Sequence, residues 1–234
     1  MSADRRTARP LLQEQVRSLL TDYIVEHGLG PGDPLPTEQE LMREFGVGRN
    51  VLREGLKALQ ALGIVEVRHG YGTFVGNAGL TALERGLHFR AAMSLRAGLG
   101  ELRDLLDVRE ALEVGLAARV VAAVDDAQLA ALEEIVQGMQ RAAAAGDYFP
   151  ELDWRFHETL YAPLGNALVT DLLRVFWRVF GDVEAQLPGA RYTPVAAAGW
   201  HAGILAAVRQ QDVGATQRAV ATHFADIRER LGRA

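Results

Sequence analysis

The sequence predicts a mainly α-helical protein, built from an N-terminal winged helix-turn-helix and a C-terminal antiparallel all-helical bundle of six or seven helices. Three observations support this fold class. Residues 34–76 contain the signals of two short helices followed by a small hairpin. From about residue 78 onward, alanine and leucine dominate and apolar residues recur at helical spacing. The stretches between these helical segments are short, which implies antiparallel neighbours.

The same pattern divides the chain into three parts. We expect the winged helix-turn-helix domain over residues 1–76, a linker or connecting helix over 77–95, and the helical domain over 96–234. With 234 residues and a mass of 25.5 kDa, the chain has room for one small domain and one of ordinary size.

The first helix of the helix-turn-helix has recognisable ends. Thr37 and Glu40 form the S/T-x-x-E capping box that begins a helix, and Pro36 keeps the chain before the cap extended. Gly46 is typical of a helix end. Only residues 47–48 separate this end from the next periodic stretch, so the connection is a tight corner.

The second helix, over residues 49–62, divides into two arcs at 100° per residue, with Leu56 at the border. The apolar arc holds Val51, Leu52, Gly55, Ala58, Leu59 and Leu62. The polar arc holds Arg49, Asn50, Arg53, Glu54, Lys57 and Gln60. Arginine can bind a guanine edge and lysine a phosphate, so this polar arc suits the major groove of DNA.

A basic hairpin is expected directly after this helix. Two short strands are predicted at residues 64–68 and 73–76 around the tip HGYG, with Arg68 and His69 at its end. Taken alone, cations at helical spacing most often form a solvated face. The combination of a capped helix, a short turn, a polar-arc helix and a basic wing favours DNA as the partner.

Residues 11–76 resemble the winged helix-turn-helix of the GntR family of bacterial transcriptional regulators. The family pattern L-P-[ST]-E-x-x-L, G-V-[ST]-R-x-x-[VL]-R-x-[AG]-L, G-x-[IV] and an R-x-G-x-G-[TS]-F-V wing is nearly complete here. By this resemblance, Arg49 and Arg53 would contact bases or the neighbouring phosphates, and His69 and Gly70 would reach the minor groove. The expected DNA-contacting residues are Thr37, Gln39, Arg49, Asn50, Arg53, Lys57, Arg68, His69 and Gly70.

Two positions depart from the family pattern. Gly48 replaces the usual Ser or Thr before the recognition helix, which removes a phosphate donor and costs only a few tenths of a kcal/mol as a cap. Gln39 stands where an arginine is common, so one contact to DNA would be absent. Asn50 and Thr37 would lie near the DNA backbone by the same resemblance.

Bulk properties restrict the class of protein. The net charge is −5, and acidic and basic residues nearly balance even within residues 1–76, so DNA binding must rest on a local basic face. The absence of cysteine excludes disulfides and thiolate metal sites. The start of the chain is polar and no apolar run approaches the length of a membrane span. We therefore expect a cytoplasmic protein without membrane contact.

Apolar periodicity predicts helical segments through the rest of the chain. They are expected near residues 80–95, 101–123, 126–145, 148–161, 166–187, 193–209 and 213–232. Glycine, proline and acidic residues, which favour turns, separate these segments. Their spacing and short connections fit the antiparallel bundle.

Four polar residues lie on helical faces that should be apolar. Asp153 and His157 are four residues apart and share one face of a helix. His201 and His223 are each eleven residues from Asp212, at the turn between the last two segments, so an antiparallel hairpin brings them level. Imidazole nitrogens and one carboxylate suit a divalent transition metal such as Zn, Ni, Mn or Fe. A hydrogen-bonded histidine core is the simpler alternative, which spacing alone leaves open.

Residues from about 100 to 230 resemble the FCD effector domain of the FadR-type branch of GntR regulators. The pattern D-x-x-F-H-x-x-[LI], followed by one histidine in each of the last two helices, is matched at Asp153, His157, His201 and His223. By this resemblance these four residues would bind a metal beneath a small carboxylate ligand.

Arg109 is expected to complete a ligand site. It lies on the stripe of Leu105 and Leu112, and a guanidinium there can hold a carboxylate through two hydrogen bonds. The family pattern V-R-x-x-L-E has its effector-binding arginine at this position. A structural ion pair to Glu113 or Asp153 is the alternative. Asn166 is a second candidate for the pocket, although helix capping explains it more simply.

These elements together suggest a homodimer whose two recognition helices bind a two-fold symmetric operator in double-stranded DNA. A small organic acid bound in the bundle would change DNA affinity, most simply by releasing the operator. Two other classes remain open: a metal-dependent enzyme, for which no well-placed general base is seen, and a metal-independent dimeric regulator.

Overall fold

A computed structural model describes residues 4–189 and 192–232 of the chain, and the side chains from residue 14 onward within those ranges. The chain splits into two compact units, the N-terminal unit of residues 1–83 and the C-terminal unit of residues 84–234. This division falls inside α4 (Thr81–Ser94), within the segment predicted to connect the two domains.

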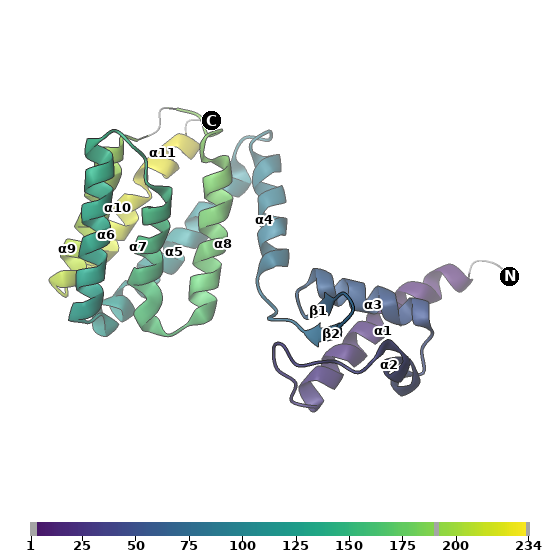
Figure 1. The fold of residues 1–234 in the computed structure, drawn as a ribbon. Helices are drawn as coiled ribbons and strands as arrows, with labels where there is room; N and C mark the ends of the chain where they lie inside the picture. The colour runs from purple at the N-terminus through teal and green to yellow at the C-terminus, as the bar shows by residue number, and fades with distance from the viewer. Residues whose placement is uncertain (1–3, 190–191, 233–234) are drawn as a thin grey trace. The chain divides into compact units, whose positions relative to one another are not determined.

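The N-terminal unit is a winged helix-turn-helix (Figure 1). Its elements are α1 (Asp4–Glu26), α2 (Glu38–Phe45), α3 (Arg49–Ala61), β1 (Val65–Arg68) and β2 (Gly72–Val75). The two strands pair antiparallel, from Val65 opposite Val75 to Arg68 opposite Gly72. Buried Val16 and Leu20 of α1 share one hydrophobic core with residues of α2, α3 and both strands.

The predicted start and end of the first helix of the helix-turn-helix are confirmed. Thr37 Oγ1 accepts from the backbone N–H of Glu40, and the Glu40 side chain accepts from the backbone N–H of Thr37, which completes the capping box. Gly46 ends α2 in the left-handed region at φ +63°, a conformation that favours glycine. Gly48 precedes α3 without a side-chain cap, as its missing hydroxyl predicts.

The buried face of α3 differs from the predicted arc at two positions. Leu56, expected at the border, is buried, and Leu62, expected inside, is 43% exposed. The first difference arises because α1 packs along α3, and Leu56 belongs to the core that the two helices share. The second arises because the helix ends at Ala61, so Leu62 no longer follows its periodicity.

The C-terminal unit is a helical bundle, and its helices stand side by side in Figure 1. After α4, its α-helices are α5 (Gly100–Ala123), α6 (Asp126–Ala144), α7 (Pro150–Tyr161), α8 (Ala167–Glu184), α9 (Pro194–Arg209), α10 (Val213–His223) and α11 (Ala225–Gly232). A short 3₁₀ turn, η1 (Ala162–Leu164), follows α7. Helix α9 packs against α6 and α10, and α10 packs against α5. This mainly α fold agrees with the sequence prediction.

One predicted helix is interrupted. The segment 213–232 was expected to be continuous, but it forms α10 and α11 with a break at Phe224. The Phe224 side chain is fully buried, and neither glycine nor proline marks the break in the sequence. Tertiary packing of Phe224 therefore overrides the local helical pattern at this point.

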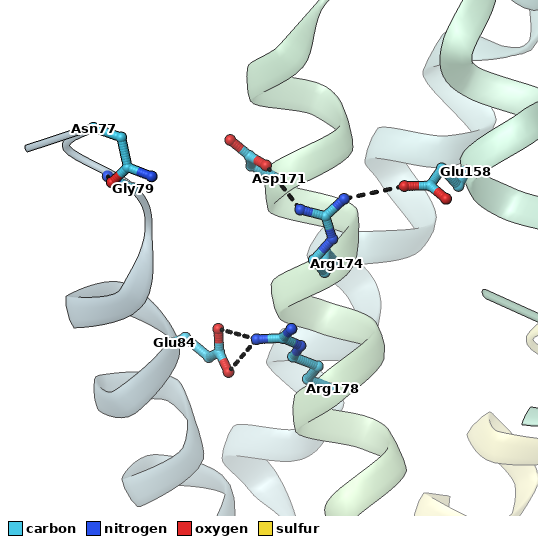
Figure 2. A network of polar contacts seen from close by, with 7 residues as sticks. All are labelled: Asn77, Gly79, Glu84, Glu158, Asp171, Arg174 and Arg178. Carbon is cyan, nitrogen blue, oxygen red and sulfur yellow. Dashed lines mark hydrogen bonds and ion pairs between the residues drawn. The ribbon is translucent and has the colours of Figure 1, made fainter. Parts of the chain in front are cut away.

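Ion pairs attach α4 to α8 within the C-terminal unit. Arg178 Nη1 on α8 lies 3.2 Å from Glu84 Oε1 on α4. Figure 2 shows this pair facing each other from the two helices. Asp182 Oδ2, one turn further along α8, lies 3.2 Å from His88 Nδ1. Because most of these side chains are partly exposed, the pairs orient α4 more than they stabilise it. In the described part of the chain, no helix has both the length and the apolarity to cross a membrane.

Candidate functional site

The four residues predicted as metal ligands converge in the C-terminal unit. Asp153 and His157 come from α7, His201 from α9 and His223 from α10, and one ligand atom of each lies within 4.8 Å of the others. The rings of His201 and His223 are 4.6 Å apart between centroids, so the predicted level pairing across the hairpin is confirmed. The His157 ring lies 5.1 Å from that of His223.

His201 has one ring nitrogen that faces this cluster without a hydrogen bond. Its Nδ1 lies 2.8 Å from the backbone oxygen of Ala197, which accepts the single proton of a neutral ring. Its Nε2 therefore carries a lone pair and lies 2.9 Å from Asp153 Oδ1, another electron-rich atom. A cation shared by these two atoms would convert their repulsion into attraction.

The other two imidazoles leave similar nitrogens unsatisfied. His157 Nε2 and His223 Nδ1 are buried and have no hydrogen-bond partner among the described residues. An unpaired buried polar atom is costly, so three such nitrogens in one place call for a common partner. Burial and the neighbouring rings of His201 and His157 lower the pKa of His223 well below its usual value. A neutral imidazole is the form that binds a metal, so the donor set fits a divalent transition metal.

Asp153 is held ionised in this setting. Burial acts to raise the pKa of its carboxyl, but the close approach of the His201 imidazole, with those of His157 and His223, outweighs burial and holds the pKa well below the usual range. The indole Nε1 of Trp177 donates to Asp153 Oδ2 over 2.8 Å. A lone tryptophan on a helix carries no sequence signal of this contact, so only the structure identifies Trp177 as a partner of the cluster.

A second buried carboxylate lies behind the cluster. Glu113 on α5 accepts from Arg109 Nε at 2.8 Å through Oε1 and from the Tyr161 hydroxyl at 3.1 Å through Oε2. The same Oε2 lies 3.1 Å from His157 Nδ1, although the ring is not aligned for a full hydrogen bond. Burial acts to raise the pKa of Glu113, but the charge of Arg109 and the close approach of the His157 imidazole outweigh burial and hold the pKa well below its usual value.

Arg109 thus makes the ion pair to Glu113 that the sequence offered as the alternative to effector binding. It is only 5% exposed, and its guanidinium also lies over the ring of Phe224, with Cζ 5.0 Å from the centroid. The described contact to Glu113 uses Nε, and Arg109 still forms part of a cavity wall beside the cluster. The ion pair and a ligand contact are therefore compatible.

The cavity has a volume of about 90 Å³, enough for several waters or one small organic molecule. The charged and titratable side chains of its wall include those of Arg109, Asp153, Glu184, His201 and His223. The wall also includes the aromatic side chains of Tyr148, Phe149, Trp177, Phe180, Tyr192 and Trp200. A mainly apolar wall with a few polar groups is the usual lining of a small-molecule site.

Asn166 does not line this cavity. Its side-chain oxygen accepts from the backbone N–H of Val169, so it caps the N-terminus of α8 and is exposed. The capping role preferred for it from the sequence is confirmed.

The predicted DNA-contacting residues lie on an exposed face of the N-terminal unit. On α3, Arg49, Asn50, Arg53 and Lys57 are all exposed. Arg53 Nε lies 3.0 Å from Glu38 Oε1. Lys57 Nζ lies 2.9 Å from Glu54 Oε1, and Arg49 has no ion-pair partner among the side chains that the structure describes.

The wing is a tight, exposed hairpin. Gly70 and Gly72 adopt φ of +80° and +117°, values that favour glycine, which explains the spacing of HGYG. Arg68 is paired with Glu66 at 3.1 Å and lies over the ring of Phe74. Tyr71 at the tip is 84% exposed and was not singled out from the sequence, although an aromatic residue on an exposed turn is itself unusual. Thr37 and Gln39 are exposed at the start of α2.

Comparison with protein families agrees with this architecture. Residues 12–75 match the family described as bacterial regulatory proteins of the gntR family. Residues 104–226 match the FCD domain, and these matches cover more than half of the chain. The chain belongs to the GntR family. It is a GntR-family DNA-binding transcriptional regulator with an FCD domain, and both resemblances inferred from the sequence are confirmed.

Individual GntR-family relatives support the assignment. The chain is 34% identical over 188 residues to an uncharacterized HTH-type transcriptional regulator of Mycobacterium tuberculosis, covering 78% of this chain and 74% of the relative. It is 29% identical over 227 residues to the galactonate operon transcriptional repressor of Escherichia coli, covering 91% and 93%. The solved structure of Streptococcus agalactiae GntR matches 93% of this chain and 99% of its own, with 26% identity and a TM-score of 0.63. The family and these relatives are regulators, not enzymes.

Proposed function

We propose that this GntR-family protein is a ligand-responsive regulator that binds a palindromic operator as a homodimer. A small organic acid, bound at a metal site in the C-terminal unit, would control its affinity for DNA. One observation carries the proposal: three imidazoles with unsatisfied nitrogens converge with the carboxylate of Asp153, and His201, His223 and Asp153 of this cluster line a cavity together with the buried Arg109.

Asp153, His157, His201 and His223 are the proposed ligands of a divalent transition metal, with Zn, Ni, Mn and Fe as candidates. When bound, the metal would supply a Lewis acid to which an effector carboxylate can coordinate. Four protein ligands and an open side toward the cavity are compatible with such an added ligand.

The effector is proposed to be a small carboxylic acid. Arg109 is a cavity-lining cation whose planar guanidinium can donate two parallel hydrogen bonds to a carboxylate. Because Arg109 is buried, the interaction would be stronger there than at an exposed position. The cavity volume restricts the acid to a small one.

DNA binding is proposed to use α3 and the wing of each subunit. Two-fold symmetry would place two recognition helices in successive major grooves of a symmetric operator. A relative carries the name of an operon repressor, which supports repression and its relief by ligand for this chain as well. An effector can release DNA only to the extent that it binds the two protein states differently.

Elemental analysis of protein purified without chelator tests the metal site. The native chain should contain a transition metal in a fixed ratio, and His157→Ala should lose it while still binding operator DNA. His88→Ala removes an imidazole from α4, outside the cluster, and should retain the metal. Operator fragments selected from a random DNA pool would provide the binding assay.

The opposite results would identify the alternatives. Metal-free native protein with normal operator binding would indicate the metal-independent dimeric regulator. Loss of operator binding in His157→Ala with an unchanged fold, judged by circular dichroism, would contradict a site that acts through the effector.

A further inference from the structure

Three polar atoms lie close to the single buried carboxylate of Glu113, whose side chain is 1% exposed. Oε1 lies 2.8 Å from Arg109 Nε, while Oε2 lies 3.1 Å from the Tyr161 hydroxyl and 3.1 Å from His157 Nδ1. Oε1 accepts from Arg109 Nε, which can only donate, and Oε2 accepts from the Tyr161 hydroxyl. A carboxylate suits these contacts because neither of its oxygens carries a proton.

The Oε2 edge of Glu113 lies beside one nitrogen of the His157 ring. Glu113 Oε2 is an acceptor 3.1 Å from Nδ1, whereas Nε2 has no hydrogen-bond partner among the described residues and belongs to the ring that joins the metal-ligand cluster. His201 has a similar arrangement with a different acceptor, since its Nδ1 lies 2.8 Å from the backbone oxygen of Ala197. In both rings an acceptor thus lies beside Nδ1.

We propose that Glu113 is a positioning residue that holds His157 as its Nδ1–H tautomer and thereby presents Nε2 to the metal. The inference rests on the metal site proposed above. It also gives Arg109 a second role, because the residue proposed to anchor the effector carboxylate shares Glu113 with a metal ligand. A carboxylate behind a ligating histidine fixes the ring and raises its basicity.

Glu113→Gln is the sharpest test, because glutamine has nearly the same shape but only one accepting edge. The charged Arg109 would attract the amide oxygen, which turns the amide NH₂ toward His157. His157 Nδ1 would then have to accept, and its proton would move to Nε2, where it blocks metal binding. A neutral side chain of equal size would produce no such change if Glu113 only filled space.

Two measurements follow. The first is nuclear magnetic resonance of metal-free protein with ¹⁵N-labelled histidine. His157 should be the Nδ1–H tautomer in the native chain and the Nε2–H tautomer in Glu113→Gln. The signal that is lost in His157→Gln assigns the resonance to His157. Zinc affinity, measured by competition with a chelating dye, should fall by about 10- to 100-fold in Glu113→Gln.

A matched control and a rescue separate this effect from general damage. Glu110→Gln removes the same charge from the same helix and breaks the surface ion pair with Arg228, and it should retain the native zinc affinity. The double variant Arg109→Gln, Glu113→Gln removes the cation that competes for the amide oxygen. The amide can then turn toward His157, so the Nδ1–H tautomer and most of the zinc affinity should return. This double variant also tests the inference if an unpaired Arg109 prevents Glu113→Gln from folding.

The possible failures are distinct. If the native chain binds no metal, the proposed function fails, but the tautomer prediction can still be read from the metal-free spectra. If native zinc affinity or the Nδ1–H tautomer persists in folded Glu113→Gln, the role of Glu113 is refuted while the metal site stands. Loss of zinc in the double variant as well would also refute it, because the loss would then not depend on the competition between Arg109 and His157.

Discussion

The cations of α3 differ in how their charge is balanced. Arg53 and Lys57 each lie beside a carboxylate of their own unit, Glu38 and Glu54, and these exposed pairs must be weakened or shared when a phosphate approaches. Arg49, at the first position of the helix, has no such partner among the described side chains. Its interaction with DNA would therefore cost no existing ion pair.

This difference predicts a large effect of Arg49→Ala. Specific DNA affinity should fall by about 1–3 kcal/mol, as expected for the loss of a base-contacting arginine. Fluorescence anisotropy with a labelled operator and a scrambled duplex at one salt concentration measures the change. Arg96→Ala removes an exposed arginine from the C-terminal unit and should leave the affinity unchanged. Equal operator binding by Arg49→Ala and the native chain would show that this helix face is not the DNA interface.

At the scale of elements, the C-terminal helix α11 stabilises the end of α8. Arg230 is only 4% exposed, and its Nη2 donates to the backbone oxygen of Glu184 at 2.8 Å and of Leu187 at 3.3 Å. Its Nε donates to the oxygen of Pro188 at 3.3 Å. These carbonyls lie where α8 ends, and the Arg230 guanidinium gives them a charged donor. Since Glu184 and Leu187 also line the cavity, α11 supports one wall of the candidate site.

Arg230→Met should destabilise the C-terminal unit because it leaves these buried carbonyls without their charged donor. We expect a loss of about 1.5–3 kcal/mol in the free energy of unfolding. Urea unfolding followed by tryptophan fluorescence is suitable, since Trp177 and Trp200 line the adjacent cavity.

Arg228→Met provides the matched comparison on the same helix. Arg228 forms a partly exposed ion pair with Glu110, so its removal should cost less than about 1 kcal/mol. Equal losses for the two variants would mean that the carbonyl contacts of Arg230 contribute little beyond packing.

At the scale of the whole molecule, the net charge of −5 gives DNA no general attraction to this protein. We therefore expect specific binding to use the local surface of α3 and the wing, and we propose that the C-terminal unit controls it. The proposed coupling between these units is an equilibrium between states, and effector binding typically shifts such an equilibrium by about 1–3 kcal/mol.

Metal binding should stabilise the folded chain. Because the four proposed ligands come from α7, α9 and α10, the site assembles only in the folded state. For chelator-treated protein, zinc buffered at 100 times its dissociation constant should raise the free energy of unfolding by about 2.7 kcal/mol. Thermal and urea unfolding at several buffered zinc concentrations provide the measurement. A native chain whose stability is independent of zinc, or a His157→Ala variant that gains as much from it, would contradict the site.

Local sequence rules were sufficient for much of this protein. The capping box of Thr37 and Glu40 and the left-handed Gly46 defined the corner, because caps depend on atoms only a few residues away. Helical periodicity placed most segments to within a few residues. The equal number of residues from the turn to His201 and to His223 predicted their pairing. In an antiparallel helical hairpin, residues equally far from the turn lie at the same level along the two helices.

Only the tertiary structure decided the contacts that join distant segments. The approach of Glu113 to His157, the bond from Trp177 to Asp153 and the burial of Arg230 connect helices whose relative rotation no local pattern specifies. The break at Phe224 has the same origin, because packing there outweighs helical preference. The sequence by itself thus determined the fold class and the identity of the polar cluster. How each ring and carboxylate is oriented was decided by the packing of helices far apart in the chain.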